Sequence, residues 1–203
     1  LEKKQLEIKA KLKETELRFL KSQVNPHFLF NTLNNLYSLS LRKSDQAPDM
    51  ILKLSELLDY SLHRAEAERI PLKEEVAFIE NYCELARMRF GEAIKISIET
   101  AIENPEYEVP PMIFLPFVEN AIKHGIHPEY PESFVRINFC QKDSELGFRI
   151  TNTLFDTDTR INQDTGVGLS HVKSRLELLL EGRYVLRISE DNELFSVNLT
   201  IHE

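Results

Sequence analysis

Hydrophobic positions in the first third of the chain recur at helical spacing. Leu29, Leu33 and Leu36 fall on one face of a helix drawn at about 100° per residue. The opposite face carries a polar stripe made of Gln23, His27, Asn31, Asn34 and Ser38. A helix that only packed against a neighbour would have little use for these residues, because asparagine is a mediocre helix former. The pattern therefore predicts a helix that presents an imidazole on its polar face.

The spacing extends on both sides of this helix. Over residues 1–22 an a/d-type stripe (Ile8, Leu12, Thr15, Phe19) predicts a helix that pairs with another helix or chain. Its basic excess fits either a solvated helix end or a juxtamembrane helix below a membrane span, and the sequence leaves both open. Residues 41–50 break the pattern, and helical spacing resumes over 49–65. Two helices joined by a short turn form a hairpin, and a doubled hairpin forms a four-helix bundle.

The pattern changes in the second half of the chain. After a helix from about Lys73 to Phe90, alternating segments predict strands and longer apolar runs predict helices. The expected strands are 94–99, 134–140, 146–152 and a closing hairpin formed by "YVLRIS" and "LFSVNLTI". The expected helices are 112–125, ending at Gly125, and 168–182. The fold class is therefore α+β: a helical hairpin over 1–68, then an α/β sandwich with a mixed sheet over 69–203.

Composition narrows the possible functions. A chain of 203 residues, 42% hydrophobic, can form one sizeable domain or two small ones. Its net charge of −8 gives no general indication of nucleic-acid binding. Cys83 and Cys140 show no metal-binding spacing and are expected to be free thiols in a reducing compartment. The sequence contains no membrane-span-length apolar run and no signal peptide. It begins inside an amphipathic charged run, as expected of a piece cut from a longer protein.

Two segments of the second half carry candidate chemistry. In "ENAIKHG", Asn120, Lys123 and His124 share one helix face, where an amide oxygen suits a metal ion and an ammonium suits phosphate. A helix end decorated with cations would give the same pattern without a ligand. In "TGVGLSHVKSRL", Gly166 and Gly168 precede a helix, where backbone N–H groups can bind phosphate. The two segments together indicate nucleotide binding more strongly than either does alone.

Three motifs resemble a known family. "LKSQVNPHFLFNTLNNL", "VPPMIFLPFVENAIKHGI" and "TGVGLSHVKSRLELLLEG" are similar to the histidine box, the N box and the second glycine box of LytS/YehU-type sensor histidine kinases. The resemblance covers the chain from about residue 20 onward. It implies a dimerisation and phosphotransfer hairpin followed by a GHKL (Bergerat) ATP-binding domain. It also implies the cytoplasmic part of a bacterial membrane protein, a homodimer that signals to a response regulator of the LytTR type.

The resemblance assigns roles to individual residues. His27 matches the phospho-acceptor, and a neutral imidazole is a competent nucleophile at cell pH. Asn31, one turn on, is expected to orient the ring. Asn120 is implied as the Mg²⁺ ligand, with Glu119 beside it as a catalytic residue. The other residues implied to contact ATP are Lys123, His124, Asn152, Gly166, Gly168 and Leu169, with a lid over residues 153–165.

One departure from the family pattern concerns adenine recognition. Relatives usually have an Asp in a DxGxG box, whereas "ITNTLFDTD" has Asn152 at that position and lacks both box glycines. An amide oxygen can still accept the adenine amino proton, but its NH₂ group cannot accept a hydrogen bond. We therefore expect weakened or altered nucleotide binding.

Two functions compete on these observations. The first is an active protein-histidine kinase that uses ATP and Mg²⁺, and the second is a degenerate dimeric sensor or scaffold. The intact His27, Asn120 and glycine pair favour the kinase, and Asn152 favours the scaffold. A third idea, metal binding through His124 and His127, fits poorly because one lies near a helix end and the other precedes a proline.

Overall fold

The computed structural model describes residues 26–64, 67–91, 94–127, 129–130, 132–155, 164–191 and 193–202, with the side chains of residues 164–171 outside that description. The chain divides into two compact units, Leu1–Glu68 and Arg69–Glu203. The helix expected over residues 1–22 and the core of the expected lid, residues 156–163, lie outside the described residues. No helix among the described residues is long and apolar enough to cross a membrane.

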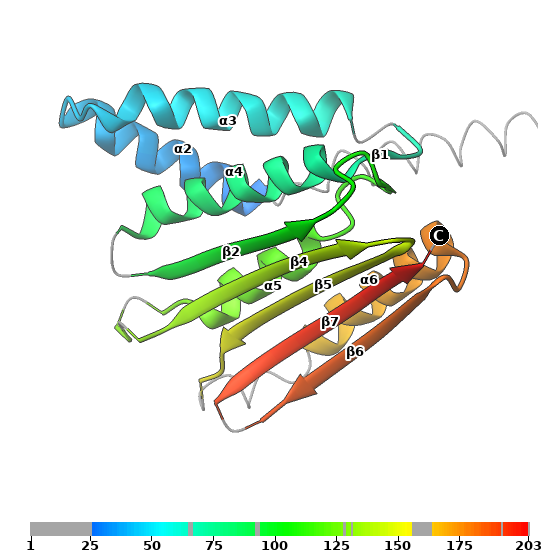
Figure 1. The fold of residues 1–203 in the computed structure, drawn as a ribbon. Helices are drawn as coiled ribbons and strands as arrows, with labels where there is room; N and C mark the ends of the chain where they lie inside the picture. Colours follow the sequence, from blue (N-terminus) through cyan, green and yellow to red (C-terminus); the bar gives the residue numbers. More distant parts are fainter. Residues whose placement is uncertain are drawn as a thin grey trace, which may run out of the picture. The chain divides into compact units, whose positions relative to one another are not determined.

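The first unit contains a helical hairpin, α2 (Pro26–Leu41) and α3 (Gln46–His63) (Figure 1). Its two helices contact each other, and Asn35 of α2 reaches the Met50 sulfur of α3 at 4.0 Å. On α2 the buried side chains are Phe28 and Thr32, while Leu33 of the expected apolar face is 48% exposed. The hairpin is therefore confirmed, and of the predicted apolar face Leu33 is exposed while Leu29 and Leu36 are half-buried.

The second unit is built on a mixed sheet of five strands in the order β2-β4-β5-β7-β6. β2 pairs in parallel with β4, and all the other neighbours in this sheet are antiparallel. The strands are β2 (Lys95–Ile102), β4 (Phe134–Lys142), β5 (Glu145–Thr153), β6 (Tyr184–Glu190) and β7 (Leu194–His202). A separate two-stranded ribbon pairs β1 (Ile70–Pro71) with β3 (Glu108–Val109). This ribbon was not anticipated, because two-residue strands leave no periodic signal in the sequence.

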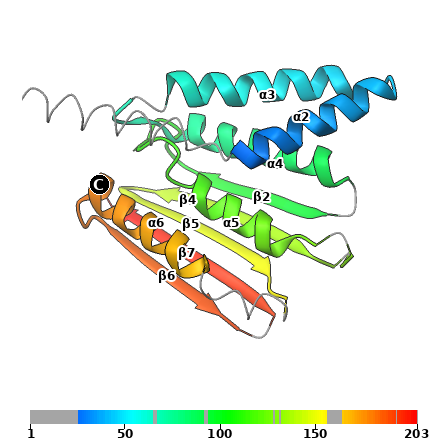
Figure 2. The same ribbon diagram turned by 180° about the vertical axis from the view of Figure 1, so that it is seen from behind.

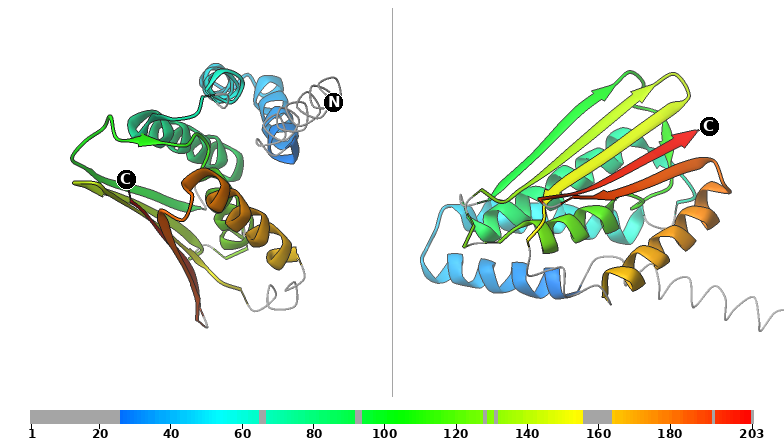
Figure 3. Two further views of the ribbon diagram at one scale, coloured as in Figure 1. Left: turned by 90° about the vertical axis from the view of Figure 1, so that its right-hand side faces the viewer. Right: turned by 90° about the horizontal axis from the view of Figure 1, so that it is seen from below.

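Three helices cover one face of the sheet: α4 (Leu72–Phe90), α5 (Leu115–Gly125) and α6 (Asp164–Leu180) (Figures 2 and 3). Strand residues alternate between buried and exposed, as expected when only one face packs on helices. Between the layers, the Phe114 ring lies 5.1 Å from the Phe139 ring and 4.6 Å from the Phe148 ring. This aromatic cluster fixes the start of α5 against β4 and β5.

The α+β class, the helical hairpin and the mixed sheet are confirmed, and two boundaries are corrected. The helix expected from Met112 begins at Leu115, because Met112 adopts φ 55°, which a right-handed helix cannot contain. The helix expected from Gly168 begins at Asp164, so Gly166 and Gly168 lie in its first turns rather than before it. Both cysteines are free: Cys83 is buried and Cys140 is exposed.

Candidate functional site

His27 lies in the first turn of α2 and its side chain is exposed. The amide nitrogen of Asn31, one turn further on, lies 3.2 Å from each ring nitrogen. An amide N–H can donate to a ring nitrogen that carries a lone pair, and the amide oxygen of the same side chain can instead accept a ring N–H. The helix thus holds an imidazole at the surface with an amide in contact, and the role of this ring as phospho-acceptor stays a prediction.

Helix α5 carries the polar residues expected to contact nucleotide. Its buried face is apolar and comprises Leu115, Phe117, Val118, Ala121, Ile122 and Gly125. Glu119, Asn120 and His124 are half-buried, and Lys123 is exposed. The helix therefore presents an amide, a carboxylate, an ammonium and an imidazole away from its buried face, and an amide oxygen and an ammonium are groups that suit a metal ion and phosphate.

Tyr82 of α4 contacts this set, and the sequence reading missed it. Its hydroxyl donates to Glu119 Oε1 at 3.5 Å, and its side chain is buried. Burial, together with the neighbouring Glu119 carboxylate, raises the pKa of Tyr82 well above 10.0. Tyr82 therefore stays protonated and remains a donor to Glu119 across the physiological pH range.

The C-terminal end of α5 packs directly against the end of β5. A Cβ built on Gly125 would lie 2.4 Å from the Asn152 Cβ and 2.8 Å from its Nδ2. The sequence suggested that Gly125 merely ends the helix, but no positive φ is found there and the next residue is extended. The glycine is required because no side chain fits between the helix and the strand.

Asn152 itself is buried, 2% exposed, and its amide nitrogen donates to the Thr153 carbonyl oxygen at 2.8 Å. The NH₂ group that raised doubt about nucleotide binding therefore has a partner within the chain. The amide oxygen is the atom left to accept an amino proton. A carboxylate at the same position would place an oxygen against that carbonyl, which is repulsive.

A buried carboxylate supports the other end of α5. Glu75 of α4 is completely buried and accepts hydrogen bonds from the backbone N–H groups of Met112, at 2.8 Å, and Phe114, at 3.4 Å. Arg175 of α6 donates to the Pro111 carbonyl oxygen of the same turn at 3.1 Å. Adjacent glutamates in "KEEV" look alike in sequence, and no signal there marks Glu75 as the buried one.

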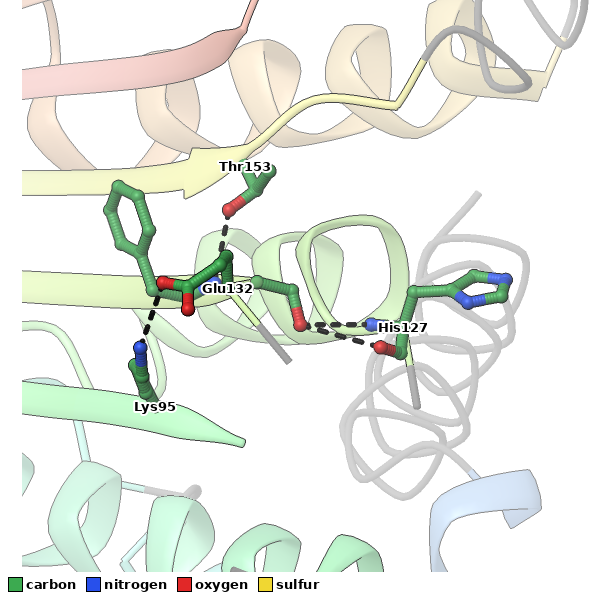
Figure 4. A network of polar contacts seen from close by, with 6 residues as sticks. Lys95, His127, Glu132 and Thr153 are labelled. Atoms are coloured by element: carbon green, nitrogen blue, oxygen red, sulfur yellow. Dashed lines mark hydrogen bonds and ion pairs between the residues drawn. The ribbon is translucent and has the colours of Figure 1, made fainter. Parts of the chain in front are cut away.

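Three aromatic rings gather beyond α5. The His127 ring lies 5.1 Å from the Tyr130 ring and 5.7 Å from the Phe155 ring. The His127 backbone exchanges two 3.4 Å hydrogen bonds with the Ser133 hydroxyl, and the ring points away from this contact (Figure 4). Among the described residues there is no group of three or more His, Cys, Asp or Glu side chains that could hold a metal ion. The His124/His127 metal site therefore gains no support.

The glycine segment is less fully described. Gly166, Gly168 and Leu169 fall in the first turns of α6, where the described structure covers the backbone alone. Their roles in contacting ATP stay predictions, as do those of Asn120, Lys123 and His124. A hairpin that presents a histidine, followed by an α/β unit with an Asn-x-x-Lys-His helix, is the arrangement that the resemblance to histidine kinases leads us to expect.

Comparisons with known proteins agree with this class. Residues 15–94 match the family model described as Histidine kinase. The sensor histidine kinase YpdA of Escherichia coli is 32% identical over 89% of this chain and 34% of its own length. The sensor protein LytS of Oceanobacillus iheyensis is 28% identical over 85% of this chain and 32% of its own, and the sensor histidine kinase YesM of Bacillus subtilis is 30% identical over 90% and 32%. The chain is similar to these sensor histidine kinases over most of its own length and spans about a third of theirs.

A solved structure, Acinetobacter baumannii histidine kinase AdeS, aligns with 93% of this chain and 95% of its own at 12% identity, with a TM-score of 0.47.

Proposed function

We propose that this chain is the kinase core of a two-component sensor: it binds Mg·ATP in the Arg69–Glu203 unit and phosphorylates His27. The observation that carries the proposal is the exposed His27 ring on α2 with the Asn31 amide in contact at 3.2 Å. Phosphoryl transfer requires mainly positioning and charge neutralisation, so an exposed and held imidazole is the group that the reaction needs.

The proposed step is a displacement at the γ-phosphorus. The lone pair of one His27 nitrogen forms the N–P bond, the bond to the bridging oxygen breaks, and ADP leaves. An amide can turn over, so Asn31 can also accept the ring N–H and leave the other nitrogen's lone pair free for attack. The phosphoryl group would then pass to an aspartate of a response regulator, which we propose to be of the LytTR type.

The α5 residues would hold the nucleotide. The Asn120 amide oxygen suits Mg²⁺, which supplies charge neutralisation when bound, and the exposed Lys123 ammonium suits phosphate. The buried Asn152 amide would accept the adenine amino proton through its oxygen. Glu119, which accepts a hydrogen bond from the Tyr82 hydroxyl, would lie beside them.

The hairpin supports a homodimer. Its exposed apolar residues are Phe30, Leu33, Tyr37 and Leu41 on α2 and Ile51, Leu52, Leu58 and Leu62 on α3. A monomer seldom leaves so many large apolar side chains exposed on one pair of helices, and a second hairpin would cover them in a four-helix bundle. We expect Leu33→Asp to convert a dimer to a monomer in sedimentation experiments. Leu178→Asp, which changes an exposed leucine of α6, should leave the dimer intact.

The decisive experiment is autophosphorylation with labelled Mg·ATP. We expect acid-labile phosphate on His27 of the wild type and no label on His27→Gln. His63→Gln is the matched control, because His63 is an exposed histidine on the other helix of the hairpin. Label that persists in His27→Gln would reject the assignment.

The alternative function, a degenerate scaffold, is favoured by Asn152. Thermal unfolding with and without Mg·ATP distinguishes it from the kinase. A ligand at a hundred times its Kd stabilises by about 2.7 kcal/mol. A kinase core should therefore unfold at a higher temperature with Mg·ATP, whereas a scaffold that does not bind nucleotide should not respond.

We further infer that the chain is the cytoplasmic part of a longer membrane-tethered sensor, on the basis of its resemblance to sensor proteins more than twice its length.

A further inference from the structure

We propose that Glu75 is a positioning residue for the nucleotide-binding helix α5, which it fixes through the backbone without touching the nucleotide. This inference rests on the proposed kinase function. Glu75 is completely buried, although a charged side chain is almost never fully buried without partners. Its partners include two backbone N–H groups in the turn that leads into α5.

The first partner, Met112, has a strained backbone. Its φ of 55° lies in the left-handed region that non-glycine residues rarely adopt, and its side chain is fully buried. Such a conformation persists only when the surrounding structure fixes it. The 2.8 Å bond from the Met112 N–H to the Glu75 carboxylate supplies that constraint at the strained residue itself.

The second partner, Phe114, is the N-cap residue of α5, immediately before its first residue, Leu115. The first N–H groups of a helix have no partner within the helix, and a negative charge near them is favourable. The Glu75 carboxylate accepts from the Phe114 N–H at 3.4 Å and so supplies both a partner and a charge. It thereby fixes where α5 begins, about one and a half turns before Glu119 and Asn120.

Arg175 of α6 also contacts this turn. Its guanidinium donates to the Pro111 carbonyl oxygen, and the Glu75 carboxylate is close enough to oppose the lowering of the Arg175 pKa that burial causes. A buried carboxylate is tolerated when a cation and hydrogen bonds compensate it. Arg175 lies on α6, whose first turns contain Gly166 and Gly168. The turn at residues 111–114, which leads into α5, therefore contacts both α4, through Glu75, and α6, through Arg175.

The opposite end of α5 is fixed by the close contact of Gly125 with Asn152. With both ends held, α5 cannot slide or rotate independently of α4 and β5. A displacement of about 1 Å can cost a hundredfold in rate when reacting groups must be aligned, so the position of α5 governs how well its polar residues meet the phosphates.

The test uses Glu75→Gln, with Glu80→Gln as the matched control on the exposed face of the same helix. The amide keeps one acceptor oxygen but turns an NH₂ group toward a backbone N–H. We expect faster hydrogen exchange at the Met112 and Phe114 amides without nucleotide and roughly tenfold weaker Mg·ATP binding. Both should be measured well below the unfolding temperature, where a loss of global stability alone leaves the affinity unchanged.

Four outcomes decide the matter. Weaker Mg·ATP binding with faster exchange in Glu75→Gln, and neither in Glu80→Gln, supports the inference. Wild-type affinity in a folded Glu75→Gln overturns it, as does an equal loss in the control. A wild-type protein that binds no Mg·ATP refutes the proposed function itself.

If Glu75→Gln does not fold, Arg175→Met is the second variant, with the exposed Lys173→Met of the same helix as its control. We expect Arg175→Met to bind Mg·ATP several-fold more weakly than Lys173→Met, because the turn loses a donor and the buried carboxylate loses its cation. Equal affinities would overturn the inference.

Discussion

Replacing Gly125 by alanine tests directly how closely the end of α5 packs against Asn152 of β5. The added Cβ would lie 2.4 Å from the Asn152 Cβ, and within 3 Å of that residue's Cγ and Nδ2. Non-bonded carbons lie about 3.5–4.0 Å apart, so the overlap exceeds about 1 Å. Neither partner can yield cheaply: β5 is paired on both sides, by β4 and β7, and the clash involves a Cβ rather than the flexible end of a side chain.

The magnitude follows from two opposing effects. Overpacking of this kind costs about 1–3 kcal/mol, and its rigid surroundings place this site toward the upper value. Alanine in place of glycine returns at most about 1 kcal/mol through helix propensity. We therefore expect a net loss of about 1–2 kcal/mol, and a fall in Tm of roughly 3–6 °C for a domain of this size.

The assay is thermal unfolding followed by circular dichroism, combined with Mg·ATP titration. Gly147→Ala is the matched control, since its Cβ would meet only the Cys140 carbonyl oxygen, at an ordinary 3.6 Å. We expect Gly125→Ala to lower both Tm and affinity, because the clash displaces Asn152, and Gly147→Ala to change Tm by little. The double variant Gly125→Ala/Asn152→Gly should recover part of the loss, as expected for directly contacting residues. A Gly125→Ala protein as stable as the wild type would refute the close contact.

Four further predictions concern other groups. Asn152→Asp should lower stability by about 1–2 kcal/mol in urea unfolding, because the bond to the Thr153 carbonyl is replaced by repulsion; unchanged stability would contradict this. Burial raises the pKa of the Cys83 thiol from 9.0 to about 12, so Cys140 alone should react with a thiol reagent in the native protein. Stability should also fall as pH rises from 9 toward 12, since the unfolded chain releases the Cys83 proton first; a Cys83→Ala variant with the same alkaline slope would count against it. Asn31→Ala should slow labelling of the phospho-acceptor several-fold while leaving the Kd for Mg·ATP unchanged, and a weakened Kd would assign Asn31 another role.

The sequence was most informative where a local pattern reports a local structure. The strands of the sheet were predicted within a few residues, because alternation of apolar and polar side chains directly reflects a sheet covered on one face. The hairpin and its presented histidine followed from helical spacing in the same way. The motif residues of α5 were placed on one helix for the same reason.

The supports of the site were not predictable from the sequence. Glu75 and its neighbour Glu74 are chemically identical, and only the path of the turn at residues 111–114 makes one of them a buried acceptor. The left-handed Met112, which shortens α5, likewise depends on a carboxylate that is distant in sequence. Tyr82 reads as an ordinary core aromatic until α5 brings Glu119 within reach of its hydroxyl.

By itself the sequence determined the order and type of the elements, the presentation of His27 and the residue types at the candidate nucleotide site. These depend on side-chain periodicity within a single helix or strand. The tertiary structure alone decided which glutamate is buried, why Gly125 must be glycine and what becomes of the Asn152 amide. Those properties arise from contacts between residues far apart in the sequence, 27 residues for Gly125 and Asn152 and 39 residues for Glu75 and Phe114. Local periodicity carries no information about such contacts, because they form only when the helices and the sheet pack together.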